Sequence, residues 1–359
     1  MSKQTIIPFG PQHPVLPEPI HLDLVLEDEK VVQAIPSVGF IHRGLEKLAE
    51  KKEFAEMIHV AERICGICSF IHGMSFSLAV EGVMKIEVPE RAQYLRVLWS
   101  EMSRIHSHLL WLGLAADAFG FESLFMHSWR VREKLLDMVE ATTGGRVIFG
   151  VSKVGGVRRD IDTETLKGMM GEFKALEEQC REITTVFEKD TSVKRRTVGV
   201  GMLPKDDAYL LGAVGPMLRA SGIASDTRML KYAAYGDLDF APVVETGCDC
   251  YARTMVRVRE VYQSFDIIRQ VIAKIPMGPV DVKVTGTPNG EYYARLEQPR
   301  GEVIHYVKGN GSKFLERFRV RTPTFANVPP LVHTLAGCQL ADVPVIVLSI
   351  DPCISCTER

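Results

Sequence analysis

Apolar residues recur at three- and four-residue steps through the middle of the chain. Between residues 89 and 119 the series consists of Leu95, Leu98, Met102, Ile105, Leu109 and Leu112. This spacing places its members on one face of an α-helix, and Pro89 is typical of a helix N-terminus. Similar patterns cover about 44–60, 122–141, 163–189 and 253–274. We therefore predict that the middle of the chain is mainly helical.

The N-terminal region has a different pattern. Several prolines between residues 8 and 19 predict an extended segment, because proline fixes one backbone angle and disfavours helix in the residue before it. Leu22, Leu24 and Leu26 then alternate with polar residues, and a charged turn follows. This alternation predicts a β-hairpin.

Strand patterns return near the C-terminus. Residues 302–309 and 314–320 flank Gly309-Asn310-Gly311, which has the composition of a hairpin turn. A short helix near 328–338 is predicted next. The apolar run at 343–350 is predicted to be a buried strand that leads into the last cysteines.

Together these patterns predict an α+β fold, mainly helical, with small N- and C-terminal β-sheets. The absence of internal repeats and low-complexity linkers predicts a single domain over 1–359. Within it we expect an extended segment and hairpin at about 1–40, a helical core at about 41–275, and a C-terminal α+β segment at about 276–359.

Composition limits the classes of function. The chain is 46% hydrophobic and 25% charged, as in ordinary globular proteins, and its net charge of −2 gives no reason to expect nucleic acid as a partner. The N-terminus lacks the apolar core of a signal peptide, and no apolar run reaches the roughly 18–20 residues of a membrane span. We therefore expect the 8 cysteines to lie in a reducing compartment, where metal binding or catalysis is more common than disulfide bonding.

Two Cys-x-x-Cys pairs are the strongest chemical signal. Cys65 and Cys68 lie in RICGICSFIHG, and Cys353 and Cys356 lie in DPCISCTER. This spacing lets both sulfurs of a pair bind one ion, and thiolates suit zinc, copper(I), iron–sulfur clusters and nickel. Spacing alone is compatible with a structural zinc site. Against zinc, almost the whole chain separates the pairs, and many reactive residues surround them.

The surrounding residues resemble a known family. The segment Arg63–Cys68 with His72, and the segment Asp351–Cys356 with Arg359, are similar to the paired signatures of nickel–iron hydrogenase large subunits. GPQHP, HRGLEK, EMSRIHSHLLWLG, GPMLRASG and YARTMVRVREVYQS resemble the 49 kDa-type, quinone-site subunit of complex I. Membrane-bound, energy-converting hydrogenases share both sets of motifs. The complex I subunit lacks the four cysteines, which this chain retains.

The resemblance implies a fold, a cofactor and roles for the cysteines. It implies the hydrogenase large-subunit fold and a nickel–iron centre whose iron carries cyanide and carbon monoxide. Cys65 and Cys353 would be terminal nickel ligands, while Cys68 and Cys356 would bridge nickel and iron. His72 would donate a hydrogen bond to a bridging thiolate; the alternative is a buried core histidine.

Further residues match positions of the same family. Arg300, in EQPRGEV, matches an arginine held over the open face of the metals, and Asp351 would orient it. Arginine suits this role because its charge is permanent and its planar group donates several hydrogen bonds. Thr324, in RTPTF, matches a position that hydrogen-bonds an iron cyanide.

Two glutamates match positions with other roles. Glu18 stands at the offset of the family's proton-transfer glutamate, although its context, LPEPI, departs from the usual one. Glu46, in HRGLEK, matches a ligand of a magnesium- or iron-type ion, but the last residue is Arg359 where histidine is usual. His13, in GPQHP, is an alternative residue for the cleft of Glu18.

The remaining cysteines supply no complete set of iron–sulfur ligands. Cys180 and Cys338 lie in apolar patterns and are expected in the core. Cys248 and Cys250 leave a second metal site as an alternative, but two cysteines are too few for an iron–sulfur cluster. The resemblance therefore implies an iron–sulfur small subunit, ferredoxin and complex I-like membrane subunits as partners, with this chain peripheral on the cytoplasmic side of the membrane. The implied activity is reversible heterolytic cleavage of H2. Two alternative functions are a metal-free quinone-site subunit of the complex I type and a non-enzymatic scaffold protein stabilised by a structural zinc site.

Overall fold

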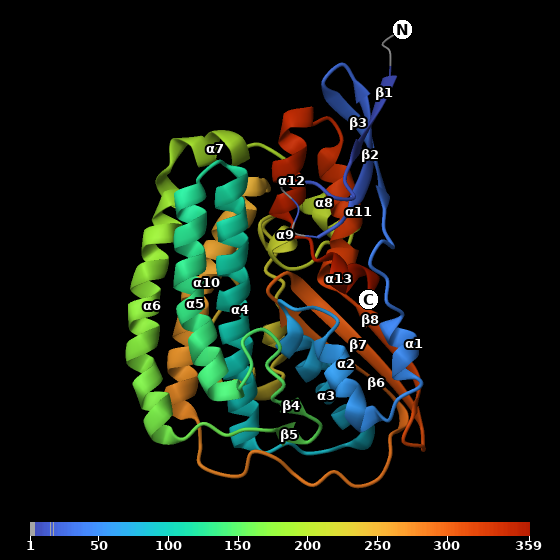
Figure 1. Cartoon of the computed structure of the whole chain (residues 1–359), viewed down its shortest axis with the longest axis vertical. Coiled ribbons are helices and arrows are strands. Elements are labelled where there is room, and N and C mark those ends of the chain that lie inside the picture. Colours follow the sequence, from blue (N-terminus) through green and yellow to red (C-terminus); the bar gives the residue numbers. More distant parts are fainter. Residues whose placement is uncertain (1–3, 15, 17) are drawn as a thin grey trace.

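The computed structural model describes residues 4–14, 16 and 18–359. Four long helices stand side by side along one flank of the molecule, and a three-stranded sheet with shorter helices forms the other flank (Figure 1). A second three-stranded sheet projects at the end that carries the N-terminus (Figure 1). The predicted α+β class, mainly helical with small sheets from both ends of the chain, is confirmed.

The four long helices form the larger hydrophobic core. They are α4 (Glu90–Ala118), α5 (Glu122–Thr143), α6 (Thr163–Lys189) and α10 (Cys250–Lys274). Helix α4 packs against α5 and α10, and α6 packs against the same two helices. Asp162 and Asp249 cap α6 and α10 by accepting hydrogen bonds from backbone N–H groups of the first turn. The helices predicted at 89–119, 122–141, 163–189 and 253–274 therefore form nearly as expected.

The second flank consists of a sheet and the helices that pack on it. Its strands β6 (Asn289–Gln298), β7 (Gly301–Asn310) and β8 (Leu315–Arg321) are antiparallel in that order. Helix α3 (Ser69–Met84) packs against β6 and β7, and α1 (Leu45–Ala49) packs against β8. Helix α2 (Phe54–Glu62) packs against α3. The hairpin predicted around Gly309-Asn310-Gly311 is thus confirmed.

The N-terminal sheet covers a smaller core. Its strands are β1 (Gln4–Phe9), β2 (His21–Glu27) and β3 (Lys30–Ser37), all antiparallel. The predicted β2–β3 hairpin is confirmed, and Leu22, Leu24 and Leu26 point into this core. Part of the predicted extended segment forms β1, whereas residues 1–3, 15 and 17 lie outside the described residues.

The C-terminal segment corrects two predictions. Residues 343–350, predicted as a strand, contain helix α12 (Val343–Ser349), and α11 (Pro323–Leu335) begins earlier than the predicted helix at 328–338. A continuous apolar run suits a buried helix as well as a buried strand, so its β-branched residues were a poor guide. Pro344 starts the helix, and the Trp111 indole N–H donates to the Leu348 carbonyl at 2.8 Å near its end.

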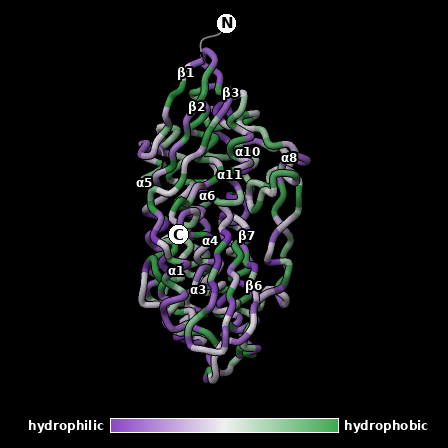
Figure 2. Tube along the Cα trace, turned by 90° about the vertical axis from the view of Figure 1, so that its right-hand side faces the viewer, coloured by the Kyte–Doolittle hydropathy of each residue, from purple (hydrophilic) through white to green (hydrophobic). Residues whose placement is uncertain are grey.

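Short elements connect the larger ones. They are β4 (Ser152–Lys153), β5 (Gly156–Val157), α7 (Thr191–Thr197), α8 (Lys205–Leu210), α9 (Pro216–Arg219), three 3-10 turns (Thr227–Leu230, Ala233–Asp237, Leu340–Asp342) and α13 (Ile354–Glu358). Hydrophobic and hydrophilic segments interleave along the whole trace (Figure 2). Within the described part of the chain, no helix has the length and apolar character needed to span a membrane.

Candidate metal centre

The two cysteine pairs meet where the two flanks of the molecule join. Cys68 immediately precedes α3, and Cys353 immediately precedes α13. The Cys65 and Cys353 sulfurs are 3.3 Å apart, and the Cys68 and Cys356 sulfurs are 3.4 Å apart. All four sulfurs lie within 4.8 Å of one another and are buried. Among the described residues this is the one group of His, Cys, Asp and Glu with the geometry to hold a metal ion.

The local backbone favours thiolates. The N–H groups of Ile67 and Cys68 point at the Cys65 sulfur at 3.3 and 3.4 Å. A hydrogen bond from Cys353 lowers the pKa of Cys65, while burial raises the pKa values of Cys68 and Cys356. Four buried thiolates cannot coexist without a cation, so the donor set fits soft metal ions.

Arg300 and Asp351 form a fixed pair beside the thiols. The Arg300 Nε donates to the Asp351 carbonyl at 2.9 Å, and one terminal nitrogen donates to the Asp351 carboxylate at 2.7 Å. The other terminal nitrogen is 3.3 Å from the Ser107 hydroxyl. Burial disfavours the charge on Arg300, but Asp351 and the neighbouring thiols outweigh it and raise the pKa of Arg300 above its usual range. The arginine thus keeps its charge beside the sulfurs.

His72 and Thr324 each contact one of the metal-site cysteines. The His72 Nε2 is 3.3 Å from the Cys356 sulfur, and burial lowers the pKa of His72 to about 4. The Thr324 hydroxyl oxygen accepts a hydrogen bond from the Cys353 N–H at 3.1 Å. Both side chains are buried. The structure therefore brings these two predicted residues to the thiols.

Glu18 binds the backbone between the last two cysteines. Its carboxylate accepts hydrogen bonds from the N–H of Ile354 and, at 2.9 Å, from the N–H of Ser355. It also contacts the Ser355 hydroxyl. Burial, followed by the negative charge of the Cys353 thiolate, raises the pKa of Glu18 to about 7. His13 stacks on Phe9 at 4.2 Å between ring centres.

The surroundings of Glu46 do not fit a magnesium or iron ion. One carboxylate oxygen accepts hydrogen bonds from the Val320 N–H and from the Arg359 Nε, both at 2.9 Å. The other oxygen lies 3.2 Å from an Arg319 nitrogen. Two guanidinium groups already neutralise the carboxylate and would repel a second cation. Arg359 already binds a carboxylate oxygen that the predicted ion would need.

Sequence reasoning missed the residues that tie the two motifs together. Arg43 donates to the carbonyls of Arg63 at 2.9 Å, Ile64 at 2.8 Å and Ser355 at 3.0 Å. The Glu358 carboxylate accepts from the N–H groups of Gly39 and Ile41, each at 2.5 Å. Arg43 lies in the HRGLEK motif and Glu358 in DPCISCTER, so these motifs were the available signal.

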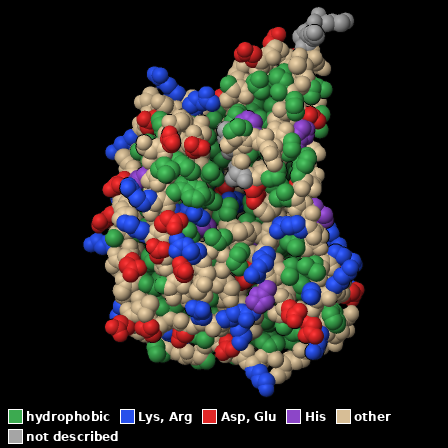
Figure 3. All heavy atoms as spheres, viewed as in Figure 1, with side chains coloured by type: hydrophobic (Ala, Val, Ile, Leu, Met, Phe, Trp, Pro, Cys, Tyr) green, Lys and Arg blue, Asp and Glu red, His purple; other side chains and the backbone are tan. Residues whose placement is uncertain are grey.

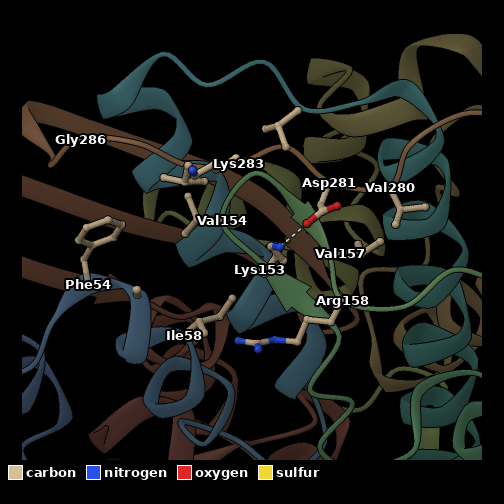
Figure 4. A pocket seen from close by; sticks show the side chains of 13 residues that line it. Phe54, Ile58, Lys153, Val154, Val157, Arg158, Val280, Asp281, Lys283 and Gly286 are labelled. Carbon is tan, nitrogen blue, oxygen red and sulfur yellow. Dashed lines mark hydrogen bonds and ion pairs between the residues drawn. The ribbon is translucent and has the colours of Figure 1, made fainter.

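A separate cavity of about 710 Å³ lies between α2, the β4–β5 hairpin and residues 280–286 (Figure 4). Lys153 and Asp281 form an ion pair at its wall. None of the predicted site residues lines it. The candidate chemistry therefore lies at the buried thiols and not in this cavity.

Comparison with known proteins identifies the family. The family model described as respiratory-chain NADH dehydrogenase, 49 kDa subunit, matches residues 118–287 and 281–359, and the nickel-dependent hydrogenase model matches residues 43–115. The carbon monoxide-induced hydrogenase of Rhodospirillum rubrum is 40% identical over 362 residues, covering 100% of both chains. The membrane-bound hydrogenase subunit alpha of Pyrococcus furiosus is 37% identical, over 98% of this chain and 87% of that one.

The fold is also similar to that of a solved structure. A chain in the membrane-bound sulfane sulfur reductase, an archaeal respiratory membrane complex, superposes with a TM-score of 0.94. Its sequence is 33% identical, and the match covers 99% of this chain and 98% of that chain. The protein belongs to the large-subunit family of membrane-bound, energy-converting nickel–iron hydrogenases, which is related to the 49 kDa subunit of complex I.

Proposed function

We propose that the chain is the catalytic subunit of an energy-converting nickel–iron hydrogenase that cleaves H2 reversibly and heterolytically. The observation that carries this proposal is the convergence of four buried cysteine sulfurs within 4.8 Å. Two hydrogen-bonded residues that match family positions, Arg300 and His72, lie beside them. A structural zinc site has no need of a buried arginine facing its sulfurs.

The four thiolates would hold the metals. Cys65, Cys68, Cys353 and Cys356 are the residues that would hold the nickel and the iron. The nickel–iron centre, with cyanide and carbon monoxide on its iron, supplies the splitting of H2 into protons and electrons. The Thr324 oxygen already accepts a hydrogen bond from Cys353, so its own proton remains available for a cyanide nitrogen.

Arg300 provides a permanent positive charge at the open side of the thiols. Asp351 binds two of its nitrogens, which fixes the plane of the guanidinium group. A preoriented cation in a buried site interacts strongly with charge that develops during reaction, because little solvent screens it. Arg300 therefore stabilises the separation of charge as H2 is polarised.

Protons would leave through Cys353 and Glu18. The Cys353 sulfur accepts the proton, and the Glu18 carboxylate passes it toward solvent. Glu18 suits this role because it binds the first turn of α13, directly after Cys353, and because its pKa of about 7 keeps both protonation states populated at neutral pH. The side chain is only partly buried, which gives it access to both environments.

Electrons would leave through a partner that carries an iron–sulfur cluster. The described residues contain no second cysteine group that could hold one. Val38 and Phe40 expose 46% and 52% of their surface in the loop that binds Glu358, two residues beyond Cys356. Hydrophobic side chains also gather at the N-terminal sheet in Figure 3. We infer that the iron–sulfur small subunit docks there, next to the metal ligands.

The wider assembly follows from the relatives. We propose that electrons are exchanged with ferredoxin and that complex I-like membrane subunits couple the reaction to ion translocation. This chain would then be a peripheral subunit on the cytoplasmic side of the membrane.

Hydrogen exchange in the purified complex tests this proposal. The parent should catalyse exchange between H2 and deuterated water, and Cys356→Ser should abolish it, because a neutral hydroxyl replaces a soft thiolate poorly. Cys338→Ser, at a half-buried cysteine outside the site, is the matched control and should retain activity. A parent complex that reduces quinone but exchanges no hydrogen would support the metal-free alternative.

A further inference from the structure

A second buried histidine contacts His72 on the side away from Cys356. His305 lies on β7, and its Nε2 is 3.0 Å from the Nδ1 of His72. The inward-facing residues on either side of it are Val303 and Val307. An imidazole among valines loses its hydration, so its position requires a hydrogen bond that compensates for the loss. The described contacts of the ring nitrogens give it one partner, His72.

The geometry allows two proton arrangements, because each neutral imidazole carries one N–H. In the first, His305 Nε2–H donates to His72 Nδ1, and His72 Nε2–H donates to the Cys356 sulfur. In the second, His72 Nδ1–H donates to His305. The second arrangement leaves the Cys356 sulfur without a donor and buries an unpaired N–H at His305 Nδ1, an atom that has no partner. The first leaves only a lone pair there, which costs less.

Gln298 fits either arrangement, because its amide can donate to His72 Nε2 or accept from it. Its side-chain nitrogen is placed 3.1 Å from His72 Nε2, while its side-chain oxygen is buried without a partner. Amide oxygen and nitrogen exchange places by a simple rotation. After that rotation the oxygen would share the His72 Nε2–H with the Cys356 sulfur, while the amide nitrogen would lack a partner. The choice between the two arrangements therefore rests on His305 Nδ1 and on the donor to Cys356.

We infer that His305 is a positioning residue, which donates to His72 and thereby holds the His72 Nε2–H toward the sulfur of Cys356. This inference rests on the proposed function, in which Cys356 would be one of the metal ligands. A hydrogen bond withdraws electron density from a metal-bound thiolate, as outer-shell partners commonly do in metal sites. His305 would therefore change the electron density at the metals indirectly, through the hydrogen bond from His72 to Cys356.

Infrared spectroscopy of the assembled complex tests the role of His305. His305→Phe removes the donor but keeps a ring beside Phe318, whose centre is 5.3 Å away. With metal content retained, the carbon monoxide band should move to lower wavenumber, because a more electron-rich iron donates more to that ligand. His305→Gln, which restores an N–H, should bring the band back toward the parent position. Val307→Ala, the packing control on the same strand, should leave it unchanged.

An unshifted band in metal-loaded His305→Phe would overturn the inference. If that variant loses its metals, the parent complex still decides the matter through ¹⁵N spectra of labelled histidine, with His72→Gln identifying the signal. His72 should carry its proton on Nε2, and a proton on Nδ1 would contradict the proposed arrangement. Absence of carbon monoxide bands in the parent would count against the proposed function instead, since the tautomer is measured without them.

Discussion

The Glu18 carboxylate accepts a hydrogen bond from the backbone N–H of Ser355 at 2.9 Å, across 337 positions of the sequence. This bond fixes a carboxylate at the first turn of α13, between the last two cysteines. Cys353 immediately precedes this turn, and its thiolate adds to burial in raising the pKa of Glu18 to about 7. Backbone N–H groups thus hold a titratable group beside a proposed proton acceptor.

Replacement of Glu18 by glutamine should stop proton transfer and leave the metals in place. The glutamine oxygen can still accept from Ile354 and Ser355, so the loop keeps its shape. Hydrogen oxidation and evolution should fall by roughly 10²-fold or more, as for loss of a general acid–base group. Conversion of para- to ortho-hydrogen should survive better than exchange with deuterated solvent, because it needs no solvent proton.

Glu18→Asp is the matched control, since it keeps a carboxylate and should retain more activity than Glu18→Gln. Equal loss of both exchange reactions in Glu18→Gln would indicate damage at the metals. An unaffected enzyme would move the proton route to another residue, with His13 the next candidate.

Arg300→Lys should lower turnover strongly while the metals remain bound. Lysine keeps a charge but cannot bind the carbonyl and the carboxylate of Asp351 with one planar group. The measurement is turnover per bound nickel. Arg295→Lys, at an exposed arginine paired with Glu302, is the control and should behave as the parent. Turnover of Arg300→Lys close to the parent value would show that Arg300 takes no part.

The Glu46–Arg359 pair should make the protein independent of magnesium. Treatment with a chelator that removes magnesium should change neither the melting temperature nor the activity. Arg359→Ala should destabilise the fold by about 1–3 kcal/mol, because it leaves a half-buried carboxylate with fewer donors. Thermal denaturation and elemental analysis check both. One magnesium per chain, lost together with stability on chelation, would show that the ion is present.

Glu62 should make stability fall as pH rises. Burial raises its pKa from 4.5 to about 7, and the nearby Arg158 and Arg63 only partly oppose this. Below pH 4.5 the group is protonated in both states; between 4.5 and 7 only the unfolded chain releases the proton. The free energy of unfolding should therefore decrease by up to about 3 kcal/mol across this window and then level off.

The pH dependence of the melting temperature measures the effect of Glu62. Glu62→Gln should flatten the curve between pH 4.5 and 7. Glu56→Gln, at an exposed position of the same helix, should not. If Glu62→Gln leaves the pH dependence of the melting temperature unchanged, Glu62 is not buried as a neutral carboxylic acid in the folded protein.

Elements with a clear hydrophobic period, and sites with a local motif, could be predicted from the sequence. Amphipathic helices such as α6 were found because one face is apolar. Helix α3 was missed because it is buried on nearly all sides, so its sequence shows no polar face. The strand predicted at 343–350 was wrong for a related reason: a short apolar run does not specify its own period.

The same distinction applies to the candidate site: local motifs identified some of its residues, whereas its long-range contacts left no local pattern. Spacing and family resemblance selected the cysteines, Arg300 and Glu18, which the fold brings to one place. The hydrogen bonds between His72 and His305 and between Arg43 and Ser355 join distant segments. No local pattern records such contacts, because they depend on how α3, β7 and the C-terminus pack together.

Metal analysis combined with infrared spectroscopy tests the central claim most directly. The purified complex should contain one nickel and one iron at the four thiolates for each copy of this chain, beyond the iron of any clusters. It should also show cyanide and carbon monoxide bands, and Cys356→Ser should lose both the nickel and the bands. Zinc alone would indicate a structural zinc site. A parent protein with no metal at the four cysteines would contradict the proposed nickel–iron centre.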